Sequence, residues 1–253
     1  MRRHTYHLLQ RKQRQRGVAL YVVAMVLMLA MLLALWTSRT SLFMEMLTSN
    51  SADDQRAFEA AQAMLQDAQH DIAMHLLNHP STTTRSSLTP LFPRTTAQWS
   101  TWAQQMQQLP APHCAHGLCL RRVQGLDFWA NHNALMQMLA AGVRYGSYSG
   151  HHANDHPLLS EHTANLGAWY WIEPLLLHTS DSGNCTTSDP SPNSCTNSTL
   201  AFRITALAFG LQGWIAKSGR NTTMAVLQSV VIPTSTGNDS TQTLRTLSWR
   251  QMQ

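Results

Sequence analysis

The chain has few charged residues and few cysteines for its length of 253 residues. Charged side chains make up only 12% of the sequence, whereas 43% of the residues are hydrophobic. A disordered chain is typically poor in apolar residues and rich in charge, so this composition excludes a fully disordered protein. The length allows one folded domain with an additional segment.

Acidic residues are absent from the chain before Glu45. The first seventeen residues hold six of the 18 basic side chains, namely Arg2, Arg3, Arg11, Lys12, Arg14 and Arg16. The remainder has twelve basic against thirteen acidic residues, so the net charge of +5 becomes −1 without this segment. The excess positive charge belongs to the N-terminal segment, and nucleic-acid binding is not indicated.

Motifs for catalysis are also absent, since the sequence contains no G-x-S-x-G elbow, phosphate-binding glycine loop or H-E-x-x-H motif. Two clusters contain side chains that could bind a metal ion. The first cluster is His113, Cys114, His116 and Cys119, and the second cluster is His151, His152, Asp155, His156, Glu161 and His162. The first lacks a usual zinc spacing, and the second lies in a predicted loop without helical spacing. We predict no enzyme, metal or cofactor, and expect the loop 151–162 to face solvent or a partner.

A long apolar run occupies residues 18–36, which contain no charged or amide side chain. As a helix these 19 residues would span about 28 Å, close to the hydrocarbon thickness of a bilayer. The basic residues before the run, with only Arg39 soon after it, predict a cytoplasmic N-terminus. No small-residue cleavage site follows Trp36, so we expect a single-pass inner-membrane protein with a periplasmic C-terminal domain.

Residues 37–78 predict an amphipathic extension of the same helix. Apolar residues recur there at helical spacing, at Phe58, Ala61, Leu65, Ala68 and Ile72. We interpret Asp53 and Asp54 as favourable charges near a helix N-terminus, and expect residues 49–51 to loosen the helix. The sequence thus predicts a nearly continuous helix over residues 18–78.

Residues 79–253 predict a periplasmic α+β domain. Helical patterns cover 99–109 and 131–141, the second capped by Gly142, and strand patterns cover 169–172, 200–209, 224–232 and 244–249. The fold class is α+β, with the long N-terminal helix packed on a C-terminal antiparallel sheet. We assign tryptophans 99, 102, 129, 169, 171 and 214 to the core and not to an adhesive surface.

The four cysteines fit an oxidising compartment. We favour two local disulfides, Cys114 with Cys119 and Cys185 with Cys195, although four cysteines allow three pairings. Each would stabilise the domain by about 2 to 3 kcal/mol on the chain-entropy estimate.

The N-terminal third resembles a type IV prepilin, because Arg16 and Gly17 end a basic leader and an apolar helix begins at Val18. The later segment SNSADDQRAFEAAQAMLQDA is similar to the PilX family of minor pilins. The C-terminal segments YWIE, FRITA and AVLQSV resemble further blocks of that family, in the same order. The resemblance implies that residues 1–17 are a leader that prepilin peptidase removes between Gly17 and Val18.

The resemblance implies a minor pilin that moves from the inner membrane into a pilus. Its partners would be other minor pilins, the major pilin, the inner-membrane assembly platform and a tip adhesin. Most pilins carry a Glu where this chain has Val22, which suggests a tip or initiating position. The alternatives are a type II secretion pseudopilin, a plain signal anchor, and a membrane-anchored adhesin or DNA-uptake module.

Overall fold

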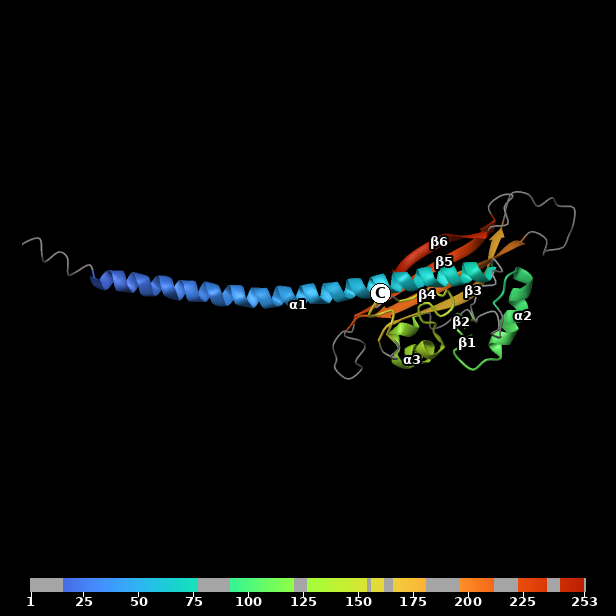
Figure 1. Ribbon diagram of the computed structural model, residues 1–253, viewed down its shortest axis with the longest axis horizontal. Coiled ribbons are helices and arrows are strands. Elements are labelled where there is room, and N and C mark those ends of the chain that lie inside the picture. The colour runs from blue at the N-terminus through green and yellow to red at the C-terminus, as the bar shows by residue number, and fades with distance from the viewer. Residues whose placement is uncertain are drawn as a thin grey trace, which may run out of the picture. The chain divides into compact units, whose positions relative to one another are not determined.

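The structure is a computed structural model that describes residues 16–76, 92–120, 127–153, 156–161, 166–180, 196–211, 223–235 and 242–252. The chain divides into two compact units, residues 1–52 and 53–253, and helix α1 contributes to both. The elements are α1 (Arg16–Leu76), α2 (Thr96–Gln107), β1 (Cys114–Ala115), β2 (Leu118–Cys119), η2 (Phe128–Ala130), α3 (His132–Ala141), β3 (Ala168–Ser180), β4 (Thr196–Phe209), β5 (Met224–Ser235) and β6 (Gln242–Met252) (Figure 1).

Helix α1 matches the predicted helix within two residues at each end. Ser49, Asn50 and Ser51 lie inside it and remain helical, so the expected loosening is wrong. The dipole interpretation of Asp53 and Asp54 is also wrong, because both lie far from the start of α1. Asp53 is instead buried, and its carboxylate accepts a hydrogen bond from the Leu211 amide at 2.8 Å.

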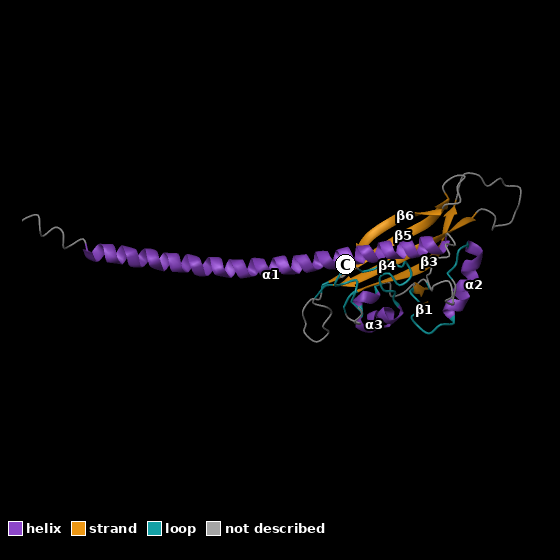
Figure 2. Cartoon of the chain, viewed as in Figure 1, coloured by secondary structure: helices purple, strands orange, loops and turns teal. Residues whose placement is uncertain are grey.

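A six-stranded sheet forms the centre of the second unit, with its strands in chain order from β1 to β6 (Figure 2). The four predicted strands are confirmed as β3 to β6, and each neighbouring pair among them is antiparallel. The sheet is nevertheless mixed, because β2 pairs with β3 in parallel. A chain that returns to pair in parallel needs a long connection, and here that connection contains α3. The α+β class is confirmed.

One face of the sheet packs on the C-terminal part of α1. The predicted apolar residues Ala61, Leu65, Ala68 and Ile72 are all at most 3% exposed. They belong to one core with side chains that alternate along the strands, including Tyr170, Ile172, Phe202, Ile204, Ala206 and Ala208. Small alanines on both surfaces allow the helix and the sheet to approach closely, and the burial of this face supplies most of the domain's hydrophobic stabilisation.

The opposite face of the sheet is covered by α3 and η2. Trp169, Trp171, Leu207 and Phe209 pack there with Phe128 and Met138. The Trp171 indole N–H donates a hydrogen bond to the Met138 carbonyl at 2.9 Å. The assignment of tryptophans to the core is confirmed for Trp102, Trp129, Trp169 and Trp171. Trp99 is half-buried, and Trp214 lies outside the described residues.

Gly142 ends α3, as predicted, but it does so in an extended conformation with φ −75°. An added Cβ would lie 2.9 Å from Trp169 Cδ1 and 3.0 Å from Trp171 Cζ2. The glycine therefore provides close packing between the end of α3 and two tryptophans of β3, and not the left-handed cap that terminal glycines commonly supply.

Candidate functional site

The first unit exposes an extensive apolar surface on α1. Every large hydrophobic side chain from Val18 to Leu47 is between 52% and 77% exposed. Among the described residues, α1 is the one helix long and apolar enough to cross a membrane. Such a surface is not stable in water, so lipid or other apolar helices must cover it.

This surface consists of two parts separated by polar residues. The first apolar block is residues 18–36, and the second apolar block is Leu42, Phe43, Met44, Met46 and Leu47. Together they extend over about 45 Å of helix, whereas the hydrocarbon core of a bilayer is about 30 Å thick. When the first block spans the bilayer, the second block therefore lies beyond the hydrocarbon and needs a different cover.

In the polar belt between the blocks, residues 37–41, two threonine hydroxyls form hydrogen bonds within the helix. Thr37 donates to the Leu33 carbonyl at 2.7 Å, and Thr40 donates to the Trp36 carbonyl at 2.6 Å. Hydroxyl groups bonded to the preceding turn are compatible with burial in an apolar environment. The remaining charge of the belt is Arg39, which is exposed.

The predicted cleavage position lies at the start of α1. Gly17 and Val18 are helical and exposed, and a Cβ added to Gly17 would meet no other heavy atom within 4 Å. Within the described residues, the side of the helix at Gly17 is thus open. Cleavage there remains a prediction.

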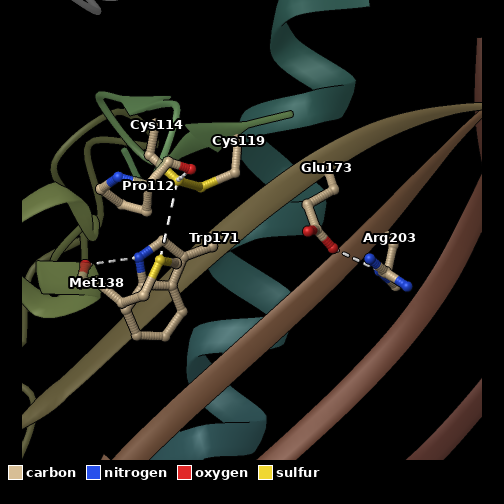
Figure 3. Close-up of a disulfide and its surroundings, with 7 residues drawn as sticks. All are labelled: Pro112, Cys114, Cys119, Met138, Trp171, Glu173 and Arg203. Carbon is tan, nitrogen blue, oxygen red and sulfur yellow. Dashed lines mark hydrogen bonds and ion pairs between the residues drawn. A yellow bond between two sulfur atoms is a disulfide. The ribbon is translucent and has the colours of Figure 1, made fainter. Parts of the chain in front are cut away.

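The predicted disulfide between Cys114 and Cys119 is present and closes the β1–β2 hairpin. His116 and Gly117 form its turn with positive φ values of 52° and 76°, the combination required by a tight type I′ turn. The Gly117 amide donates a hydrogen bond to the Ala141 carbonyl, and the Gly117 carbonyl accepts a hydrogen bond from the Ile172 amide. The hairpin is therefore docked on α3 and β3, beside Trp171 and Met138 (Figure 3).

The candidate metal ligands among residues 113–119 have other roles. The thiols of Cys114 and Cys119 are joined, so neither is available as a thiolate ligand. His113 Nδ1 lies 2.7 Å from the Leu109 carbonyl. Cys185 and Cys195, the second predicted disulfide, lie outside the described residues.

Asp67 of α1 organises the loop that contains the second histidine cluster. Its fully buried carboxylate accepts hydrogen bonds from the Gly146 amide at 2.9 Å, from the Ser149 hydroxyl and from the His151 ring at 2.9 Å. Burial, and secondarily the charge of Asp67, raises the pKa of Tyr145, whose ring stacks on His151. This role of Asp67 was not predicted from the sequence. The pattern that could have indicated it is an acidic residue among the apolar residues of an amphipathic helix face.

The second histidine cluster is only partly described, and its described members do not converge. His151 contacts Asp67, His152 is exposed, and the Glu161 carbonyl accepts from Arg144 at 2.7 Å. Asp155 and His162 lie outside the described residues. Within the described ranges, no group of three or more His, Cys, Asp or Glu side chains has a metal-binding arrangement. His151 faces solvent as expected, since its side chain is 43% exposed, and its ring also tethers the loop to Asp67 of α1.

Ser149, His151 and Asp67 do not have the geometry of a catalytic triad. The Ser149 hydroxyl donates to Asp67, and it contacts His151 through the backbone amide at 3.3 Å, not through the ring. A nucleophilic serine requires a ring nitrogen to accept its proton. The three residues instead hold a loop against a helix.

The C-terminal segments that resemble PilX contact one another or α1 through their polar residues. Glu173 pairs with Arg203 at 2.5 Å across β3 and β4 (Figure 3). Gln228 donates to the Thr205 hydroxyl at 3.1 Å across β4 and β5. Tyr170 donates from its hydroxyl to Asp71 of α1 at 3.0 Å. These residues stabilise the sheet and its attachment to α1, so the spacing of the segments has a structural cause.

A cavity of about 810 Å³ lies beside α2 and is a second candidate for binding. Its lining combines buried apolar residues, including Phe92 and Trp102, with exposed Gln98 and Gln105. The volume falls in the range of small-molecule pockets.

No family model matches this chain, and neither the curated proteins nor the solved structures include a significantly similar one. The described residues define an α+β domain on a helix whose N-terminal part exposes two apolar blocks, the polar belt between them, and the charged Glu45 within the second block.

Proposed function

We propose that this chain is a minor pilin of the PilX type that primes type IV pilus assembly, at the pilus tip, together with other minor pilins. The observation that carries the proposal is the second apolar block, whose five large side chains are 58% to 71% exposed. The sequence resemblance to prepilins and to PilX supports the same function.

The second apolar block separates an assembly subunit from a plain signal anchor. An anchor needs about 20 apolar residues, which the first block already supplies. The additional apolar side chains would be exposed to water or headgroups unless protein covers them. Helices of neighbouring subunits offer a suitable cover, because they present equally apolar surfaces over the same length.

Extraction from the membrane imposes a similar requirement on the first apolar block. A helix that leaves lipid must bury its apolar surface against another apolar surface, and helix–helix packing depends on close van der Waals contact. The absence of a charged side chain from residues 18–36 means that the block can pack on all sides. Val22, in place of a carboxylate, removes the need for a partner amine at that depth, as suits an initiating subunit.

The second unit is attached to α1 through buried carboxylates. Its buried acids Asp53, Asp67 and Asp71 accept hydrogen bonds that join α1 to the sheet and loops. These contacts fix the domain on the helix that enters the assembly. In the proposal, prepilin peptidase removes residues 1–17 in the inner membrane, after which the assembly platform moves the protein, together with the major pilin and a tip adhesin, into the pilus.

A pseudopilin of type II secretion uses the same kind of helix, so the second apolar block does not distinguish it from a pilin. The proposed pilus function rests on the resemblance to PilX at this point. A membrane-anchored adhesin or DNA-uptake module would use loops of the second unit, and a change in loop 113–119 or 151–162 would then abolish binding while the number of pili stays constant.

Crosslinking from the second apolar block tests the proposal. Phe43 is 71% exposed, and its replacement by benzoylphenylalanine in the full-length chain changes the side chain little. We expect light-dependent adducts with other pilin-like subunits in intact cells, identified by mass spectrometry. The control is the same replacement at Gln104, an exposed residue of α2, which should give far fewer such adducts. Adducts with lipid alone at Phe43 would contradict an assembly function.

A further inference from the structure

We infer that Arg39 selects a neighbouring subunit whose apolar helix carries a carboxylate at the level of Arg39. The inference rests on the proposed function, because it concerns the state in which α1 has left the lipid. It assigns a chemical requirement to one partner of this chain.

Arg39 is an isolated charge on an exposed apolar helix. It is the only charged residue between Arg16 and Glu45. In the described part of the chain, Arg39 is exposed and makes no ion pair. Glu45 lies six residues further on, about 9 Å along the axis and about 120° around the helix, so it cannot reach Arg39 within the same helix.

The two threonines of the polar belt do not create the same requirement. Thr37 and Thr40 donate to carbonyls of the preceding turn of α1, and Thr48 beyond the belt does so at 2.7 Å. Their hydrogen bonds persist when neighbouring helices cover them. Arg39 is therefore the charged group of the belt that must find its partner outside the chain.

The environment of Arg39 changes between the membrane and the assembly. Beside a bilayer, its long side chain can extend to the phosphate headgroups at the end of the first apolar block. Between helices no headgroup remains, and a buried guanidinium without a counter-charge is strongly unfavourable. A carboxylate on the adjacent helix satisfies it, because carboxylate and guanidinium form two parallel hydrogen bonds.

This pairing would also give specificity. Apolar helices pack on one another with little discrimination, whereas a single buried polar group can determine which helices pair and in which register. A neighbour without the acid would leave Arg39 unpaired, and a neighbour with a base at that level would repel it. Arg39 would therefore reject partners that the apolar blocks alone would accept.

The test uses full-length chains that restore a deletion strain, with major pilin sheared from the cell surface as the readout. We expect Arg39→Glu and Arg39→Gln to lower surface pilin at least about tenfold while the protein stays in the membrane. Arg39→Lys keeps the charge and should restore part of the assembly. The matched control is Arg56→Glu, which reverses an exposed arginine of α1 in the second unit and should assemble normally.

Suppressors of Arg39→Glu identify the partner. We expect restored piliation to arise from an Asp or Glu changed to Lys or Arg in the apolar helix of another pilin-like subunit. Normal assembly by Arg39→Glu would overturn the inference, as would loss of this variant from the membrane, which indicates a headgroup contact. If deletion of the whole chain leaves surface pilin unchanged, the proposed function itself fails; if only the Arg39 variants behave like wild type, the inference alone fails.

Discussion

A chain carrying Gly17→Ala is expected to remain uncleaved in the inner membrane and to leave the cell without restored surface pili. The reason is chemical recognition, because the resemblance to prepilins places the peptidase cut directly after this glycine. Misfolding does not explain such a result. A Cβ at residue 17 meets no heavy atom within 4 Å, and alanine favours a helix more than glycine does.

The mass of the mature chain measures this effect directly. The wild-type protein should lack residues 1–17. If the substitution lowers processing at least about tenfold, at least about nine of ten Gly17→Ala molecules should retain these residues. Ala19→Gly is the matched control, because it exchanges the same two residue types at another exposed position of α1. The control should be cleaved normally. A Gly17→Ala chain that loses its leader like wild type would contradict the predicted cleavage site.

The largest effect on stability is expected from Asp67→Ala. The substitution removes the shared acceptor of Gly146, Ser149 and His151, and the first two then lose a partner in a partly buried site. A donor that loses its acceptor in such a site costs about 1 to 3 kcal/mol. The loop from 144 to 151 should be held to α1 more weakly, because its three hydrogen bonds to the carboxylate are lost while the contact between the His70 and His151 rings remains.

Thermal unfolding of the full-length protein in detergent, followed by the fluorescence of its buried tryptophans, measures the loss. Asp54→Ala is the control, since Asp54 is the exposed neighbour of buried Asp53 on the same helix and should change stability by less than about 0.5 kcal/mol. Asp67→Asn keeps the size of the side chain and one acceptor oxygen, so its effect should be intermediate. Equal stability of Asp67→Ala and Asp54→Ala would contradict the role assigned to Asp67.

Periodic features of the fold could be predicted from the sequence because they depend on neighbouring residues. The spacing of Ala61, Leu65, Ala68 and Ile72 is that of a helix face, and these residues are buried against the sheet. The alternation of Phe202, Ile204 and Ala206 with Arg203 and Thr205 indicated β4 for the same reason. Local cysteine spacing likewise indicated the Cys114–Cys119 disulfide.

Features that depend on contacts distant in the sequence could not be predicted. Strands β1 and β2 have two residues each, too few to show alternation, and their position depends on Gly117 contacting Ala141 and Ile172. The role of Asp67 required a partner loop about 80 residues away. Asp53 was assigned to a helix start because its acceptance of the Leu211 amide, 158 residues on, leaves no local pattern.

The exposed part of α1 could be predicted from the sequence, but its meaning for function could not. Its apolar composition was evident from residues 18–36, but the second apolar block became informative only when its side chains proved to be exposed. Exposure of Leu42, Phe43 and Met44 beyond the length of a bilayer span makes a protein partner the natural cover. In the same part of α1, Arg39 forms no ion pair with a described residue, and our proposal of a carboxylate on the partner is based on this observation.

The measurement that tests the central claim most directly is the amount of major pilin sheared from the surface of a strain that lacks this chain. The account predicts that surface pilin falls strongly in the deletion strain, returns with the wild-type copy and does not return with the Gly17→Ala copy, while total major pilin in the cells stays constant. Unchanged surface pilin in the deletion strain would contradict a role in priming pilus assembly.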